Sequence, residues 1–201
     1  MLHSNTQALI EEWRTRRGSA RLPLRTDLSP AAFGPLLPQL FVLGLDAGKE
    51  RVRLAGGLLH DLHGRELRGL EFGSLWAGMD RSRILAAVAD SRRTSRPVVL
   101  RAQSVTAEGA ALGLEIAVCP LIGPTDLPDR TIGLYQPTGL TARLQGRAIE
   151  RLHLTAVEPV EDPACDLAPP FVPGRFATSV SAPVSARAAL RLVIDNSRRV
   201  A

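Results

Sequence analysis

Two histidines three positions apart give the sequence its clearest potential for chemistry. They lie in the string His60-Asp61-Leu-His63, in a segment whose composition favours helix. Residues at i and i+3 share a helical face, and imidazole and carboxylate groups are common ligands of zinc. Asp61 or Glu66 could complete such a set, so one interpretation is a small metal-dependent hydrolase centred on His60, Asp61 and His63. The alternative is that both rings are structural or contact a ligand without metal.

A hydrolase site of this kind needs further histidine and aspartate ligands downstream of the pair. The only histidine that follows is His153, which lies in a segment with weak secondary-structure signals. We therefore expect no metal centre and no catalytic residues. His60 and His63 are treated as candidate ligand-binding residues, with the hydrolase as the alternative function.

The next string, Gly64-Arg-Glu-Leu-Arg-Gly69, could direct two arginines toward an anionic ligand, because guanidinium groups match carboxylates and phosphates. The alternative is a helix stop and a turn, with Arg65 in a local ion pair and Leu67 in the core. Trp76, a short distance on, is either a core residue or a stacking surface. Arg65 and Trp76 complete the set of candidate ligand-binding residues.

Other classes of chemistry lack their sequence signals. The chain has no phosphate-binding P-loop and no nucleophile elbow, and Cys119 and Cys165 have no metal-site or disulfide spacing. The net charge is +5, but the basic residues are dispersed and almost all arginine, since Lys49 is the only lysine. Nucleic-acid binding is therefore not expected, although an arginine-rich DNA-associated regulator is a third hypothesis.

The location follows from what the N-terminal segment and the apolar runs lack. The first residues contain no long apolar signal-peptide region, and no apolar run reaches the roughly 20 residues that span a bilayer. We expect a cytoplasmic protein without membrane insertion. At 201 residues, 45% hydrophobic and 22% charged, the chain suits one globular domain with extensions.

An amphipathic helix is predicted near the N-terminus, at residues 5–17. Leu9, Ile10 and Trp13 fall on one stripe, with charged residues on the other faces. We expect this stripe to be exposed and to form the surface of a homodimer. The alternative is that the stripe packs on the chain's own sheet.

Alternating and continuous apolar runs predict five strands in the order strand, strand, helices, strand, strand, strand. The helical block starts after Gly56 and closes with a helix that Asp80 caps. This order predicts an α+β fold, a five-stranded antiparallel sheet with helices packed on one face plus the N-terminal helix. The strands are expected at 40–46, 51–55, 97–106, 111–121 and 130–136.

Three regions follow from this organisation. Residues 1–38 form the N-terminal helix and a Pro-containing connector, and residues 39–139 form the domain. Residues 140–201 form a C-terminal extension that is largely flexible, because it is rich in proline. Within the extension, residues 148–157 could add an edge strand, and residues 186–199 could form a terminal helix.

Three motifs resemble a divergent bacterial branch of PAS domains. They are an R-x-A-G strand end that closes at Gly56, the GRELRG turn of residues 64–69, and an F-x-x-L-W close from Phe72 to Trp76. The resemblance extends over about residues 10–139. The sequence differs from the family at Gly57, where Thr is more common, and at His60 and His63, in a helix that is usually more apolar.

The resemblance implies a cytoplasmic regulatory or sensory module without enzymatic activity. PAS domains hold a small ligand or cofactor between sheet and helices, or they serve as docking and dimerisation units. The resemblance thus implies a homodimer, a signalling protein partner and a small-molecule ligand. The flavin-binding type requires a cysteine in an N-C-R-F-L-Q setting, which this sequence lacks, so no cofactor is assigned.

Overall fold

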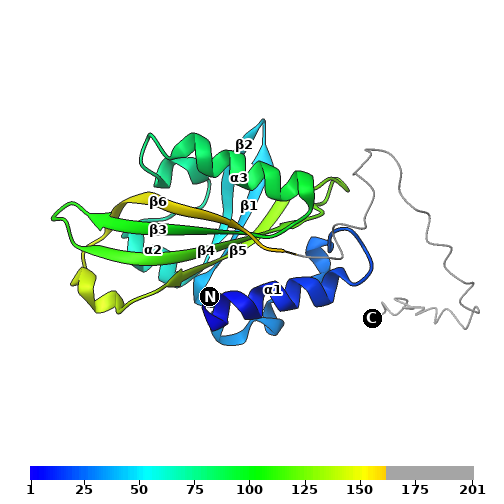
Figure 1. Ribbon diagram of the computed structural model, residues 1–201, viewed down its shortest axis with the longest axis horizontal. Helices are drawn as coiled ribbons and strands as arrows, with labels where there is room; N and C mark the ends of the chain where they lie inside the picture. The colour runs from blue at the N-terminus through cyan, green and yellow to red at the C-terminus, as the bar shows by residue number, and fades with distance from the viewer. Residues whose placement is uncertain (162–201) are drawn as a thin grey trace, which may run out of the picture. The chain divides into compact units, whose positions relative to one another are not determined.

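A six-stranded antiparallel sheet forms the centre of the fold (Figure 1). The computed structural model describes residues 1–161. The strands are ordered β2-β1-β5-β4-β3-β6 across the sheet. Their bounds are β1 Leu40–Asp46, β2 Lys49–Ala55, β3 Val98–Thr106, β4 Ala111–Leu121, β5 Arg130–Pro137 and β6 Ile149–Pro159.

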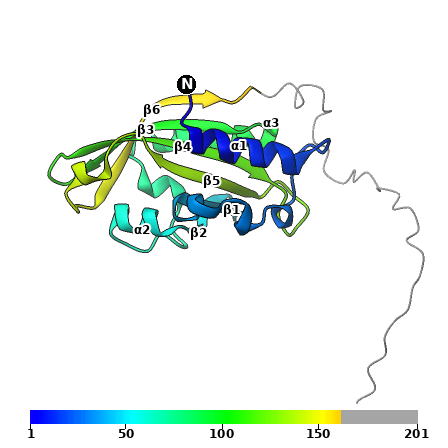
Figure 2. The ribbon, with the colours of Figure 1, turned by 90° about the horizontal axis from the view of Figure 1, so that it is seen from below.

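Helices cover both faces of this sheet (Figures 1 and 2). One face, here named the inner face, packs against α2, η4 and α3. The other, named the outer face, packs against α1 and the connector that follows it. The helices are α1 Ser4–Arg17, α2 Gly57–His63 and α3 Arg81–Thr94, with short 3-10 turns η1 Arg25–Asp27, η2 Pro30–Ala32, η3 Gly34–Gln39, η4 Phe72–Leu75 and η5 Thr141–Leu144.

Strand β4 shows why the sheet has two cores. Successive side chains of a strand point to opposite faces, so a strand that is covered on both sides is apolar throughout. On the inner face β4 contributes Leu114, Ile116 and Val118, and on the outer face it contributes Ala117 and Cys119. Both sets are buried, which explains the continuous apolar run of the sequence.

The predicted α+β fold, with its antiparallel sheet and N-terminal helix, is confirmed, but the strand count of five is wrong. Strand β6 pairs with β3 from Val98↔Pro159 to Thr106↔Ile149 and forms one edge of the sheet. Its pattern was weak because exposed charged and polar residues separate the buried Ile149, Leu152 and Leu154. This strand confirms the edge strand that the sequence suggested at residues 148–157.

Asp80 does not cap α3 as predicted. Its side chain makes no cap hydrogen bond, and its Oδ2 instead accepts a hydrogen bond from the backbone N–H of Leu154 at 3.0 Å. The backbone N–H of Ala77 also donates to the Leu152 carbonyl at 2.8 Å. The turn before α3 thus holds the outward edge of β6, which explains how a weakly apolar strand is fixed in the sheet.

The glycines of the three motifs that resemble PAS domains are required by close backbone packing or by a positive φ angle. A Cβ at Gly56 would collide with the carbonyl oxygens of Leu37 and Pro38, so only glycine lets η3 approach the start of α2. Gly64 and Gly69 have positive φ values of 60° and 84°, in the left-handed region that glycine adopts without strain. The GRELRG string is therefore a double turn that returns the chain from α2 to the edge of β2.

Helix α1 packs on its own sheet, so the expected exposed stripe is corrected. Leu9, Ile10 and Trp13 are 0%, 2% and 0% exposed within the outer-face core. The indole Nε1 of Trp13 donates to the Pro120 carbonyl at 2.8 Å, and the Arg17 guanidinium lies 5.2 Å from the ring centroid. The stripe is buried because the outer face of β4 and β5 is itself apolar and needs a cover.

Two further predictions concern the C-terminal residues and the membrane. Residues 162–201, which include Cys165 and the predicted helix at 186–199, lie outside the described residues. Within residues 1–161, no helix has the length and apolar character needed to cross a bilayer.

Candidate ligand-binding site

Three aromatic rings form the centre of the inner face. Phe41 and Phe72 stack with ring centroids 5.6 Å apart, and Phe72 meets Trp76 edge-on at 5.9 Å. Gly133 of β5 makes room for the first ring, because a Cβ there would collide with Phe41. The F-x-x-L-W motif thus carries the aromatic part of the helical cover.

A buried polar pair joins this cover to the sheet. His63, at the end of α2, lies with its Nε2 2.9 Å from the hydroxyl of Tyr135 on β5. Burial, and secondarily the charge of Arg65, lowers the pKa of His63 to about 4, although the Ile149 carbonyl acts in the opposite direction. Burial raises the pKa of Tyr135. Both groups are therefore neutral at pH 7, as a hydrogen bond between two uncharged groups requires.

Nε1 of Trp76, a side chain that is 4% exposed, lacks a hydrogen-bond partner among the described residues. Nδ1 of His63, a side chain that is 3% exposed, makes no hydrogen bond within ordinary distance and angle limits, although the backbone of Ile149 interacts with the ring. The indole nitrogen can only donate, while the imidazole nitrogen donates or accepts according to its tautomer. A buried polar group without a partner costs about 1–3 kcal/mol, so a small molecule that supplied the partners would gain from both.

The structure separates the four predicted ligand-binding residues into two pairs. His63 and Trp76 lie under the cover, as described above. His60 is half-buried near the surface, with its ring nitrogens 3.3 Å from the Arg65 carbonyl and 3.2 Å from the Ala55 carbonyl. The Arg65 side chain is exposed. Only His63 and Trp76 can therefore face a ligand held between the cover and the sheet.

The same geometry separates the residues of the metal hypothesis. The ring of His63 is engaged by Tyr135, whereas the ring of His60 faces backbone carbonyls, and Asp61 is exposed. Among residues 1–161, no group of three or more His, Cys, Asp or Glu side chains could hold a metal ion. The spacing of i and i+3 did not bring the two imidazoles to a common point.

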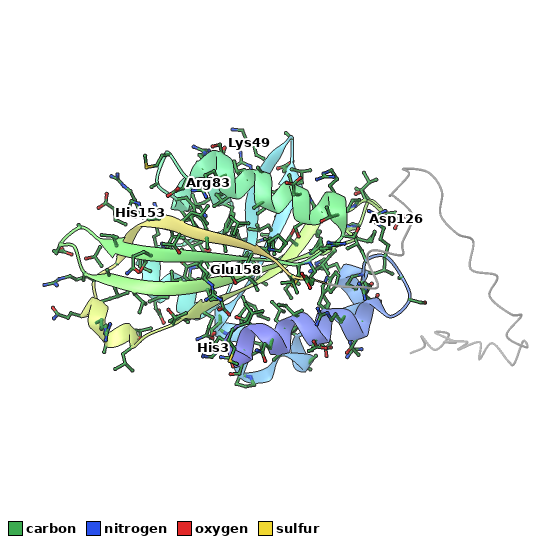
Figure 3. The ribbon with its side chains drawn as sticks, viewed as in Figure 1. His3, Lys49, Arg83, Asp126, His153 and Glu158 are labelled. Carbon is green, nitrogen blue, oxygen red and sulfur yellow. The ribbon has the colours of Figure 1, made fainter. Side chains whose placement is uncertain are left out.

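The outer face carries a charged network that the sequence analysis missed. Glu115 of β4 is 1% exposed, and its Oε1 accepts a hydrogen bond from the backbone N–H of His3 at 2.9 Å. Its Oε2 lies 3.0 Å from Nη1 of Arg101, which also binds Glu158 with Nε–Oε1 at 2.5 Å. Hydrogen bonding from Arg101 lowers the pKa of Glu158. Figure 3 labels His3 and Glu158 at the two ends of this network.

A neutral contact continues this network at α1. The Nδ2 of Asn5 donates to Oε1 of Gln136 on β5 at 2.9 Å, beside the paired position Glu115 on β4. A glutamate inside the apolar run of residues 111–121 was the one sequence signal for this site. The partners of Glu115 are far away in the sequence, so only the sheet register brings them together.

With this geometry established, comparison with known sequences decides the family. Residues 1–136 match the family described as PAS domain. The chain belongs to the PAS domain family. No curated protein matches the chain.

Three solved structures with similar folds have sequences distant from that of this PAS domain. The LOV protein of Rhodobacter sphaeroides is 15% identical, with 72% of each chain covered and a TM-score of 0.43. An RNA-binding Light-Oxygen-Voltage receptor is 18% identical over 61% of this chain and 36% of its own, with a TM-score of 0.43. The blue-light photoreceptor Aureochrome1 LOV is 10% identical over 57% and 86%, also at 0.43.

Cys119, the cysteine of this PAS domain within residues 1–161, does not fit flavin chemistry of the reactive-cysteine type. Such chemistry needs a thiol on the ligand side of the sheet. Cys119 instead lies fully buried in the outer-face core, beneath α1, and burial raises its pKa. The sheet separates this thiol from the inner face, so no step through a flavin is assigned to it.

Proposed function

We propose that this PAS domain is a sensory or regulatory module without catalysis of its own. It binds a small molecule on the inner face of the sheet, beneath α2, η4 and α3, and it reports binding to a partner through α1. The support for a ligand is the buried Trp76 Nε1, which lacks a partner among the described residues, together with the buried His63 ring, whose Nδ1 has only the Ile149 backbone nearby. The cytoplasmic location expected from the sequence is kept as part of this proposal.

One observation carries the proposed route from ligand to α1. Tyr135 and Gln136 are neighbours on β5 and point to opposite faces of the sheet. The hydroxyl of Tyr135 contacts His63 on the inner face, and the amide of Gln136 contacts Asn5 of α1 on the outer face. A shift of β5 that changes one contact must therefore change the other.

Strand β4 repeats this arrangement beside β5. Ile116 faces the inner core opposite Tyr135, while its neighbour Glu115 faces α1 opposite Gln136. A ligand that favours one position of the two strands would shift the population of docked α1 by its difference in affinity for the two states. The two central strands are thus the elements whose displacement carries the signal.

In this proposal, the partner binds the apolar stripe of α1 after α1 has separated from the sheet. Leu9, Ile10 and Trp13 then become available, either to a second copy of the chain or to another signalling protein. A Glu115→Arg substitution places a positive charge beside Arg101 and beneath α1, which should release the helix while leaving the stripe intact. The matched control is Glu150→Arg, at a half-exposed position of β6.

Sedimentation velocity at micromolar concentration measures the outcome of that pair. The Glu115→Arg variant should sediment as a larger species than the wild type, and the Glu150→Arg variant should not. If both variants sediment as the wild type does, self-association through the released stripe is wrong. The proposal then requires a partner protein other than a second copy of the chain.

Hydrogen–deuterium exchange tests the coupling itself. Tyr135→Phe removes the hydroxyl that contacts His63, and we expect faster exchange at the amides of α1. The control is Val88→Ala, which destabilises the inner core from α3 and leaves the residues of β5 unchanged. If α1 exchange in the two variants depends only on their loss of global stability, β5 does not carry a signal.

Metal analysis separates the proposal from the hydrolase alternative. The sensory module predicts no stoichiometric zinc, manganese or iron in the purified protein, because His60 and His63 face different partners. A metal content near one ion per chain that is lost in a His60→Ala, His63→Ala double variant would favour the hydrolase.

A further inference from the structure

A charged cleft lies apart from the inner-face aromatic residues, where the β1–β2 hairpin meets η4 and α3. Its volume is about 510 Å³. Figure 3 labels Lys49 at the hairpin beside α3. One part of the wall is apolar and the rest is charged. We name it the hairpin cleft, and its lining residues are Leu45, Gly48, Lys49, Glu50, Glu71, Gly73, Arg81, Leu85, Ala89 and Arg92.

Three cations meet a single carboxylate on one side of the hairpin cleft. Glu71 Oε1 lies 2.7 Å from Lys49 Nζ and 3.7 Å from Arg51 Nη2, and Glu71 Oε2 lies 2.6 Å from Arg81 Nη2. One carboxylate cannot use all the donors of an ammonium and two guanidinium groups, since these carry three and five N–H bonds each. Donors and positive charge remain for a second anion.

A buried ion pair forms the other charged part of the wall. Glu50 and Arg92 contact each other with side chains that are only 5% and 10% exposed. Glu50 Oε2 and Arg92 Nη1 nevertheless lack hydrogen-bond partners among the described residues. Both atoms are buried within the wall of the cleft, next to the excess of cations.

The backbone of η4 is adapted to this arrangement at Gly73. A Cβ at this position would lie 3.0 Å from both Cγ and Nε of Arg81, which is tighter than ordinary contact. The absence of a side chain therefore lets the Arg81 side chain cross η4 and reach Glu71. The arrangement of charges in the cleft thus depends on a specific backbone position, the glycine at residue 73.

We propose that the hairpin cleft binds an organic phosphate. Its phosphate would bind Lys49 and Arg81, and its apolar part would lie against Leu45 and Leu85. Three cationic side chains of the lining, Lys49, Arg81 and Arg92, face two carboxylates, Glu50 and Glu71, an excess of one positive charge. Arg51 lies outside the lining but adds a further positive charge next to Glu71. A phosphate monoester carries about −1.5 to −2 at pH 7 and so complements this positive excess. This site is separate from the ligand of the proposed function, and either can exist without the other.

Isothermal titration calorimetry with phenyl phosphate tests the proposal, because this probe combines an apolar ring with a dianion. The key variants are Arg81→Gln and Arg83→Gln, which remove equal charge from the same helix. Arg83 is 61% exposed and lies outside the cleft lining. We expect Arg81→Gln to weaken binding about tenfold and Arg83→Gln to change it less than about twofold, the difference expected for one lost charge-assisted contact.

Three further probes define what is recognised. Benzoate should bind more weakly than phenyl phosphate. Inorganic phosphate should also bind more weakly, because it lacks the apolar ring, and benzyl alcohol should not bind. Equal affinity for phenyl phosphate and benzoate would replace the organic phosphate with a general organic anion and overturn the proposed class. Absence of phenyl phosphate binding to the wild type at millimolar concentration would overturn the site.

Two controls keep the result independent of folding and of the inner face. Gly73→Ala retains every charge but displaces Arg81, and it should also weaken binding, while thermal unfolding verifies that each variant is folded. Tyr135→Phe should bind phenyl phosphate as the wild type does. Equal weakening by Arg81→Gln and Arg83→Gln, or NMR shifts that map outside the cleft lining, would show nonspecific attraction and overturn the proposal.

Discussion

The inner and outer faces of the sheet bury different kinds of polar groups. On the outer face, the charged side chains Arg101, Glu115 and Glu158 are paired with one another and with the start of α1. On the inner face, His63 and Trp76 are uncharged, and the indole nitrogen of Trp76 has no partner in the described chain. The outer face holds a segment of its own chain through paired charges, although Thr6 Oγ1 of α1 also lacks a partner in the described chain, whereas the polar groups of the inner face are neutral.

This difference also separates the energetic roles of the two faces. Apolar burial of α1 supplies most of the docking energy, and the Glu115 network fixes where the helix starts. Strand β5 carries one polar residue of each face, Tyr135 and Gln136, and β4 pairs with it at both positions, so these strands connect the two sets of polar groups. A substitution on one face should therefore change the packing and stability of that face strongly, and it should affect the other face only through these strands.

The largest expected effect comes from the outer face. Trp13→Ala removes a fully buried indole and its hydrogen bond to the Pro120 carbonyl, and it should lower the free energy of unfolding by about 3–5 kcal/mol. Urea denaturation measures this loss. Leu140→Ala, at a position that is 74% exposed, is the apolar control and should change stability by less than about 0.5 kcal/mol. A loss below about 1 kcal/mol for Trp13→Ala would mean that α1 does not depend on the outer-face core.

The next effect is a pH dependence of the inner face. The pKa of His63 is about 4 in the folded protein against 6.5 as its ordinary value. Below pH 6.5 the unfolded chain takes up a proton that the folded protein does not, so stability falls as the pH drops toward 4. The contribution lost by pH 4 is about 3 kcal/mol. Unfolding free energies measured from pH 7 to 4 should fall less steeply for His63→Phe, and parallel curves would contradict the buried neutral ring.

A smaller loss is expected at the connection between β6 and the helical cover. Asp80→Ala removes the carboxylate that accepts from the Leu154 N–H, and it should cost about 1–3 kcal/mol by leaving a buried donor without a partner. Hydrogen exchange should rise at β6 before it rises at β4. Unchanged exchange at the Leu154 amide would show that β6 is held by its pairing with β3 alone.

Much of the fold could be predicted because its signals are local. The strands at 40–46 and 111–121 have the bounds expected from their apolar runs, and the motif glycines lie where turns require them. Strand β6 was harder to recognise, because only some of its residues are buried and its stability comes from β3 and Asp80. A pattern within one segment contains no information about such distant partners.

The candidate functional residues show the same limit. The sequence identified His63 and Trp76 as candidates, but the contact of His63 with Tyr135 joins residues 72 positions apart. The pairing of His60 with His63 was suggested by helical spacing, yet their nearest partners differ. Glu115 and Gln136 were missed because their role depends on α1 lying over β4 and β5. Spacing places side chains on an element, whereas packing decides what they face.

The central claim is that β5 couples the inner face to α1, and a double-mutant cycle tests it most directly. Tyr135→Phe and Asn5→Ala alter contacts on opposite faces of the sheet, and no hydrogen bond joins the two residues directly. Unfolding free energies of the wild type, both single variants and the double variant give their coupling. Independent distant sites add within about 0.3–0.5 kcal/mol. We predict a coupling of about 1 kcal/mol, and additivity within the error would contradict transmission through β5.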